Sequence, residues 1–320
     1  MRSAVAIAAA SAAALTLATG AHASQLIDRN ATHVRLAVNA SGEALVTYTA
    51  RGRLWHTLVW GAIDARQPTR SRPQVRFRKD YSGGWGKYRR LYWQTFGNQC
   101  RPYTGPPLPF LVAACDAPDG SHWALQSWRT PLPDLGMIPW LPVQRARELH
   151  LSHWRGPIAK LDAWTDWVGS QRYQQVFGRV TYDGQPVHGF GTTRRGAPTD
   201  GYGRLVFLDT FDSVYGRGWH RENSFVTHDP TGIFCYGFYR FNPTKGYPHP
   251  RGFPSTLRGP GTGSKYRLTV EGPGVTPDVS VVVPGLHPYN RNDPSDVAYE
   301  QQQNAILDSI VGVDKLCRTH

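Results

Sequence analysis

The chain has 320 residues with a net charge of +13, and its 11 Trp, 15 Tyr and 12 Phe exclude a disordered chain. Glycine (33) and proline (25) are frequent while charged residues make up only 18%, a composition typical of many short strands joined by tight turns. After residue 23 no run of 18 apolar residues follows, so no transmembrane segment is predicted in the mature chain.

The first 23 residues have the pattern of a secretory signal peptide. Arg2 supplies a positive charge, Ala4–Ala18 is apolar, and Ala21-His22-Ala23 forms a small-x-small cleavage site. The sequence therefore predicts a mature protein of 297 residues (320 minus 23) that begins at Ser24 and is extracytoplasmic: extracellular, in the cell wall or in the periplasm.

Residues 24–143 are expected to form an N-terminal β domain. Thr32–Asn39 alternates between apolar and polar residues, turn residues follow at 40–42 and 51–53, and Leu54–Ile63 is an apolar run. This order predicts an antiparallel meander. Proline-rich connections at 102–109 and 131–142 place the end of the domain near Val143.

Residues 144–290 are expected to form a second β domain, an Ig-like sandwich. Asp183-Gly184 is a hairpin dipeptide, residues 233–241 are apolar on both faces and should be central, and 265–271 alternates with Leu268 inward and Thr269 outward. The expected strands are 147–154, 159–168, 176–182, 204–209, 233–241, 265–271 and 279–283.

One helix is predicted within the C-terminal segment 291–320. Asp293 is a suitable N-cap, Pro294 suits the first helical position, and Gly312 suits the end. A partial apolar stripe is formed by Ala298, Ile306, Leu307 and Ile310. The overall expectation is a mainly β protein with a single C-terminal helix.

A short segment resembles a known family of modules. Gly178-Arg-Val-Thr-Tyr-Asp-Gly184-Gln-Pro186-Val187-His-Gly189, followed by Thr199-Asp200-Gly-Tyr-Gly203-Arg-Leu205, resembles the carboxypeptidase regulatory-like (transthyretin-type) β-sandwich. The resemblance covers residues 178–205. It implies an Ig-like sandwich that serves as an accessory or adhesive module without catalytic residues.

Four cysteines follow the signal peptide, and export to an oxidising compartment favours two disulfides. Of three possible connectivities, we predict Cys100–Cys115 with Cys235–Cys317, because each loop then stays within one half of the chain. No two cysteines have zinc-ligand spacing, and the sequence gives no sign of another metal or of a cofactor.

The strongest functional signal is a basic–aromatic segment at residues 70–93, where eight cations and one acid give +7 in 24 residues. This excess favours an anionic partner such as an acidic polysaccharide or a wall polymer, with nucleic acid disfavoured by export. The ligand-binding candidates are Arg76, Arg78, Lys79, Tyr81, Trp85, Arg89 and Arg90. The alternative is a solvated strand face with its aromatic residues in the core.

The sequence signals for catalytic residues are weaker than the signal of the basic–aromatic segment. Asp162 and Asp166 flank a tryptophan, but four residues along a strand span about 13 Å, more than a glycosidase pair requires. His220 and Glu222, within the polar loop expected at 211–228, could support acid–base chemistry with one of these aspartates. His150 and His153 have odd spacing, which on a strand directs them to opposite faces.

The sequence thus favours a secreted, non-catalytic binding or wall-associated protein for an anionic polymer or glycan. A secreted hydrolase acting on a polysaccharide is the first alternative, and a structural or protein-partner module is the second. Enzymatic activity and oligomeric state are left open by the sequence.

Overall fold

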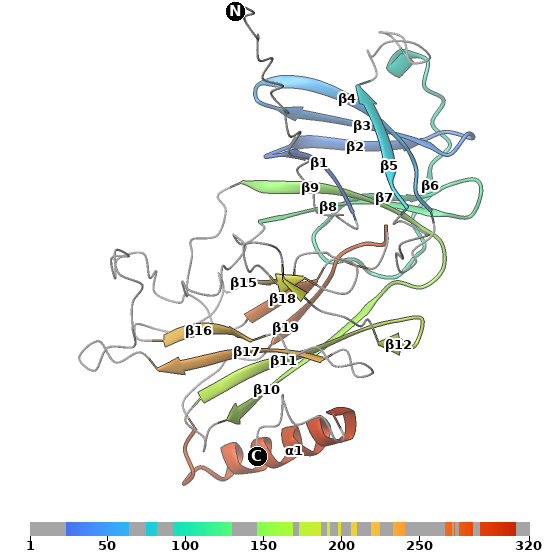
Figure 1. The fold of residues 1–320 in the computed structure, drawn as a ribbon. Coiled ribbons are helices and arrows are strands. Elements are labelled where there is room, and N and C mark those ends of the chain that lie inside the picture. The colour runs from blue at the N-terminus through green and yellow to red at the C-terminus, as the bar shows by residue number, and fades with distance from the viewer. Residues whose placement is uncertain are drawn as a thin grey trace, which may run out of the picture.

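The protein is described by a computed structural model, and it is mainly β with antiparallel sheets, as predicted (Figure 1). The described residues contain one α-helix, near the C-terminus, and a short 3-10 helix at Tyr92–Gln94. The structure describes residues 24–63, 75–81, 92–129, 146–168, 173–186, 191–192, 198–199, 206–209, 219–224, 233–240, 266–270, 272, 275–283 and 289–311. The predicted signal peptide lies outside these ranges. Within them, no helix is long and apolar enough to cross a membrane.

The N-terminal meander is confirmed as a four-stranded sheet in the order β2-β3-β4-β5. Positive φ angles at Gly42 (71°), Arg51 (52°) and Gly52 (70°) lie in the predicted turns, and two consecutive positive φ values at 51–52 suit a tight two-residue hairpin. The strands are β2 (Thr32–Val38), β3 (Glu43–Ala50), β4 (Arg53–Gly61) and β5 (Phe77–Tyr81).

A second sheet packs beneath the first in the order β1-β9-β8-β7-β6 (Figure 1). Strand β9 was expected in the C-terminal domain, but it pairs with β8 and with β1, so the N-terminal β structure extends to Trp154 rather than ending near Val143. The strands are β1 (Gln25–Arg29), β6 (Arg101–Pro102), β7 (Leu111–Asp116), β8 (His122–Arg129) and β9 (Arg147–Trp154).

The main core lies between these two sheets. Alternate residues of each strand face inward, so buried apolar side chains from both sheets meet, among them Val46, Tyr48, Trp123 and Leu151. The predicted Cys100–Cys115 disulfide is formed, with the two Cα atoms 5.4 Å apart, and it closes the loop that precedes β7. A closed loop of this length contributes about 3 kcal/mol in the chain-entropy description.

The C-terminal half contains a sheet in the order β10-β11-β17-β16 and a three-stranded sheet β15-β18-β19. Asp183 and Gly184 form the predicted hairpin turn between β11 and the short β12, and β17 is central as expected. The elements are β10 (Lys160–Val168), β11 (Tyr173–Tyr182), β12 (Gln185–Pro186), β13 (Gly191–Thr192), β14 (Pro198–Thr199), β15 (Val206–Asp209), β16 (Trp219–Ser224), β17 (Ile233–Arg240), β18 (Tyr266–Val270) and β19 (Val279–Val283).

Three details of this half differ from expectation. Residues 219–224 form β16 inside the segment expected to be a loop. Thr269 is buried together with Leu268, because both faces of β18 are covered. The second predicted disulfide cannot be followed, since Cys235 lies on β17 but Cys317 lies outside the described residues.

The C-terminal helix α1 (Pro294–Val311) begins as predicted, because the Asp293 carboxylate accepts hydrogen bonds from the backbone N–H and the hydroxyl of Ser295. Its packing differs from the predicted apolar stripe, as Ala298 and Ile306 are exposed. The helix instead contacts β10 through a hydrogen bond of 2.6 Å between the hydroxyls of Tyr299 and Thr165.

The layers in Figure 1 place the sheet containing β9 between the β2–β5 sheet and the C-terminal half. The buried residue Asp278 lies against its second face, where it contacts Ser24 and Gln126. Gln126 of β8 donates to the carbonyl oxygen of Asp278 (3.0 Å) and accepts from its backbone N–H (3.0 Å), so one amide side chain joins the two halves.

Candidate functional site

The basic strand β5 is at the end of the β2–β5 order in the described sheet, and Arg76, Arg78 and Lys79 are all exposed. The register places Arg78 opposite Trp60 and Lys79 opposite Val59, a buried core residue. Arg78 therefore lies on one face of the sheet while Lys79 belongs to the other, and Arg76 directly precedes the first residue of β5. Only the backbone of Tyr81 is described, and Trp85, Arg89 and Arg90 lie outside the described residues.

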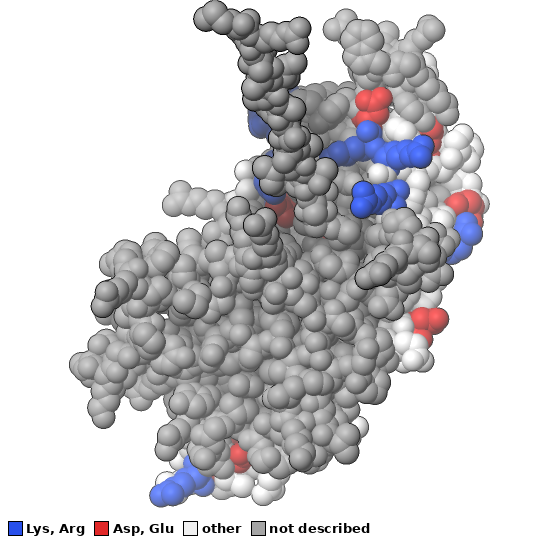
Figure 2. Space-filling model, in the orientation of Figure 1, with Lys and Arg blue, Asp and Glu red and all other residues white. Residues whose placement is uncertain are grey.

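We call the face with Arg78 the outer face, because it points away from the main core. Trp60 is half-buried there, and Trp93 (37% exposed) stacks on His56 with ring centroids 4.2 Å apart. Desolvation lowers the pKa of His56, so its imidazole is neutral at pH 7. In the view of Figure 2, most of the basic side chains that are coloured lie over the β2–β5 sheet.

Ion pairing distinguishes β5 from other basic positions. Arg29, Arg51, Arg155 and Lys160 each lie within 3.1 Å of a carboxylate oxygen, whereas Arg76 and Arg78 form no ion pair with any residue that the structure describes. The outer face beside β5 thus combines guanidinium groups that form no ion pair within the described part of the chain with aromatic rings, which can hold anions and stack on sugars.

The predicted acid–base residues are separated by the order of the C-terminal sheet. Asp162 is half-exposed and forms an ion pair with Lys160 (3.0 Å). Asp166 on β10 and Glu222 on β16 belong to one cross-strand row, but two strands lie between them. Three strand spacings are about 14 Å, beyond the roughly 9.5 Å that glycosidase carboxyl groups require. His220 and Glu222 share β16, whose backbone alone is described.

The two histidines of β9 lie on opposite faces, as their spacing predicts, and both are buried. His153 stacks on Trp123 (3.6 Å between centroids) and contacts the Gly61 carbonyl and the Ser121 hydroxyl. Burial lowers the pKa of His153 to about 4. No group of three or more His, Cys, Asp or Glu side chains that could hold a metal ion occurs within the described ranges.

His150, on the other face, belongs to a buried chain of polar side chains. Its Nδ1 lies 3.0 Å from the Ser24 hydroxyl and its Nε2 donates to Glu148 (3.2 Å), which in turn binds Arg29. The residue types are those of an acid–base triad. Ser24 and His150 are, however, 0% and 2% exposed, so a substrate cannot reach them, and the chain is structural.

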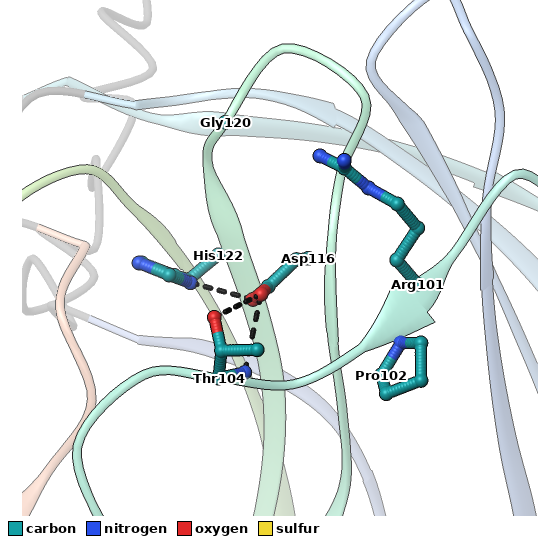
Figure 3. A pocket seen from close by; sticks show the side chains of 6 residues that line it. All are labelled: Arg101, Pro102, Thr104, Asp116, Gly120 and His122. Atoms are coloured by element: carbon teal, nitrogen blue, oxygen red, sulfur yellow. Dashed lines mark hydrogen bonds and ion pairs between the residues drawn. The ribbon is translucent and has the colours of Figure 1, made fainter.

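A pocket of about 520 Å³ at the end of the β7–β8 hairpin holds an Asp–His pair that sequence reasoning missed (Figure 3). Asp116 and His122 are directly opposite across the hairpin, and His122 Nδ1 donates to the Asp116 carboxylate (2.7 Å). The second carboxylate oxygen accepts from the backbone N–H (3.1 Å) and the hydroxyl (2.6 Å) of Thr104. The turn dipeptide Asp119-Gly120 could have indicated this hairpin.

The contacts of Asp116 favour its ionised form. Burial raises the pKa of Asp116, but hydrogen bonds from Thr104 and His122 outweigh burial and bring the net pKa below its usual value. Because His122 Nδ1 donates to the Asp116 carboxylate, Nε2 is the ring nitrogen left for other contacts. Arg101 lines the same pocket, and its guanidinium group donates one hydrogen bond to the Ala117 carbonyl oxygen (3.1 Å).

These features define a mainly antiparallel β protein with a basic–aromatic outer face and a polar pocket. Comparison with protein-family models, curated proteins and solved structures finds no match for this chain. The hairpin at Asp183-Gly184 belongs to the segment that resembles transthyretin-type modules, and that resemblance stays a prediction.

Proposed function

We propose that the protein is a secreted, non-catalytic binding protein that recognises an anionic polymer or glycan through the outer face beside β5. The observation that carries this proposal is the pair Arg76 and Arg78, exposed at the start of the last strand in the described sheet order and without an ion-pair partner among the described residues. Secretion rests on the signal sequence of residues 1–23.

The spacing of these groups suits a linear polyanion. Arg76 and Arg78 are two residues apart where β5 begins, and two residues of extended chain span about 7 Å, so the two guanidinium groups can contact successive charged units of one polymer. Trp60 and Trp93 add apolar surface on the same face for sugar rings. Tyr81, Trp85, Arg89 and Arg90 are included in the proposed site on sequence grounds.

The test is binding of residues 24–320 to polygalacturonate, a polymer with one carboxylate per sugar, with neutral dextran as the control ligand. We expect binding to polygalacturonate alone and a steep loss of affinity between about 50 and 500 mM salt. An Arg76→Glu, Arg78→Glu double variant should bind at least about tenfold more weakly, the effect of losing charged hydrogen bonds.

The matched control is Lys160→Glu, Arg291→Glu, which changes net charge equally at exposed positions away from β5. The control should retain most of the affinity. Equal losses of affinity in the two double variants would mean that net charge alone determines binding. Full binding by the Arg76→Glu, Arg78→Glu variant would mean that these two arginines do not form the site.

A secreted hydrolase acting on a polysaccharide is a second candidate, favoured by the Asp116–His122 pair in the pocket. A histidine oriented by a carboxylate can activate water as a general base, typically a factor of about 10² to 10⁴ in rate. Asp116→Asn and His122→Gln should each abolish release of product from a polysaccharide by the wild-type protein. If the wild-type protein releases nothing, this candidate fails.

A further inference from the structure

The outer face of the β2–β5 sheet has a second basic position, on β2 at the other end of the strand order from β5. Directly paired residues share a face, and Arg35 is opposite Thr47 of β3, which is opposite His56 of β4. The neighbours of Arg35 along the strand, Val34 and Leu36, pack against the main core. Arg35 therefore belongs to the outer face, where it is exposed and forms no ion pair with a residue that the structure describes.

A flat aromatic surface lies beside this position. The Trp93 ring lies over His56, with the ring centroids 4.2 Å apart and an angle of 3° between the ring planes. The imidazole is held from below by a hydrogen bond between its Nδ1 and the Thr47 hydroxyl (3.0 Å). It covers one face of the indole, and Trp93 is nevertheless 37% exposed. The other face of the indole thus points away from the sheet and is open to a ligand.

The segment that carries Trp93 is fixed without a ligand. Tyr92 and Phe96 pack over the small apolar cluster around Leu58 on the outer face. The Tyr92 hydroxyl donates to the Glu43 carboxylate (2.8 Å), and residues 92–94 form a 3-10 turn. An aromatic ring that is already held in place loses little conformational entropy when a ligand stacks on it, so more of the contact energy appears as affinity.

Arg35 and the stacked rings are close enough to hold one sugar unit. Arg35 and His56 pair with Thr47 from its two sides, so their Cα atoms are about 10 Å apart, two strand spacings. An extended arginine side chain reaches about 7 Å from its Cα, which allows the guanidinium group to lie beside the stack. A guanidinium group can bind a carboxylate through two parallel hydrogen bonds, and an indole face packs on the apolar face of a pyranose ring.

We propose that Arg35 and Trp93 form a subsite for one uronic acid unit of an anionic glycan. The pyranose ring stacks on the open face of Trp93, and its carboxylate pairs with Arg35. The inference rests on the proposed function of the outer face and narrows the ligand to a polymer with carboxylates on sugar rings. A polyanion without rings, such as inorganic polyphosphate, can contact the arginines but gains nothing from the indole. His56 and Thr47 are positioning residues beneath the stack.

The test of stacking compares polygalacturonate, which has both the ring and the carboxylate, with inorganic polyphosphate, which has the charge alone. In residues 24–320, Trp93→Ala should weaken polygalacturonate binding about fivefold, the effect of losing one ring stack. The same variant should change polyphosphate binding by less than about twofold, because no ring contact is lost. Trp93→Phe keeps an aromatic face and should recover most of the affinity. A loss of equal size for both polymers would overturn the stacking role.

The carboxylate contact is tested by Arg35→Gln, with Arg53→Gln as the matched control. Both arginines are exposed on the same sheet and each substitution removes one charge, but Arg53 is opposite the core residue Ala50 and so belongs to the other face. Arg35→Gln should weaken polygalacturonate binding about fivefold or more, and Arg53→Gln by less than about twofold. Equal losses would assign the effect to net charge and would contradict the subsite.

The outcomes separate this subsite from the β5 site. Weaker polygalacturonate binding by the Arg76→Glu, Arg78→Glu variant, together with unchanged binding by Trp93→Ala and Arg35→Gln, would keep the proposed function and overturn the subsite. The reverse pattern would support the subsite and place glycan binding away from β5. If the wild-type protein binds neither polymer, both proposals fail.

A second measurement uses only the wild-type protein and so does not depend on how the variants fold. Hydroxyl-radical footprinting read by mass spectrometry reports the solvent exposure of individual side chains. A saturating concentration of oligogalacturonate should protect Trp93 from oxidation, whereas a neutral glucose oligomer at the same concentration should not. Unchanged reactivity of Trp93 at saturation would contradict the proposed stacking.

Discussion

The two faces of β9 are both buried, but different forces hold them. On one face Leu149, Leu151 and His153 pack with the β2–β5 sheet across the main core. On the other face Glu148 and His150 belong to the polar chain that reaches Ser24 and Asp278. The strand therefore separates an apolar core from a face where a polar chain lies beside the buried rings of Trp128 and Trp154.

The polar side chains of this alternating strand are buried, not solvated. Apolar residues at every second position indicate which side chains share a face, and the polar set is usually solvated in an antiparallel sheet. Here the polar set is buried and contacts Asp278 of the C-terminal half, so it lies at an interface between layers. The apolar face should be sensitive to lost volume, and the polar face to lost partners.

The largest effect is expected for Leu151→Ala on the apolar face. Leu151 is fully buried against Leu125 and its neighbours, so the variant loses transfer free energy and leaves a cavity. The free energy of unfolding should fall by about 2–5 kcal/mol in urea titrations. A loss below about 1 kcal/mol would mean that the two sheets are not closely packed at this position.

The histidine on the apolar face should make stability depend on pH. The pKa of His153 is 6.5 when unfolded and about 4 when folded, chiefly because burial disfavours the charged ring. Between these values the unfolded state binds more protons, so stability is retained above pH 6.5 and is lost as pH falls towards 4. The loss amounts to about 3 kcal/mol at most.

Urea midpoints from pH 8 to 5 measure this effect for the wild type and for His153→Gln, in which the substituted side chain does not titrate. The difference in the free energy of unfolding between the two proteins should narrow as pH falls. Only the wild type has a buried ring at this position whose pKa differs between the folded and unfolded states. A constant difference would place the pKa of His153 near its unfolded value.

On the polar face, Gln126→Ala should destabilise the protein by about 2 kcal/mol. The substitution removes both hydrogen bonds to Asp278 and leaves its backbone N–H and carbonyl without those partners in a buried place. The control is Gln302→Ala on the exposed side of α1, which should remain within about 0.5 kcal/mol of the wild type. Equal effects at both positions would contradict the role of Gln126 as the link between the halves.

Much of the fold is readable from local sequence. Strands 147–154 and 279–283 match β9 and β19, the hairpin dipeptide at Asp183 and the N-cap at Asp293 are confirmed, and the Cys100–Cys115 bridge forms. These features depend on side-chain alternation, positive φ or capping, each of which is decided by a few neighbouring residues.

What could not be predicted depends on which elements cover which faces. Periodicity does not reveal that β9 completes the N-terminal sheet, nor that Gln126 is matched by a residue 152 positions later. The Asp116–His122 pair was missed for the same reason, because β7 and β8 were not recognised as a hairpin. The exposed cations of β5 were found, since charge concentration is a property of the sequence itself.

The smallest effect, and the sharpest check on the polar face, is expected for Ser152→Ala. Ser152 is buried, but its hydroxyl has no hydrogen-bond partner among the described residues, unlike the amide of Gln126. Removing an unsatisfied polar atom relieves a desolvation penalty, so stability should stay within about 0.5 kcal/mol or rise slightly. If Ser152→Ala were as destabilising as Gln126→Ala, the loss of any polar side chain on this face would destabilise the protein, whether or not that side chain has a hydrogen-bond partner. A neutral result beside a costly Gln126→Ala would locate that stability in the specific contacts to Asp278.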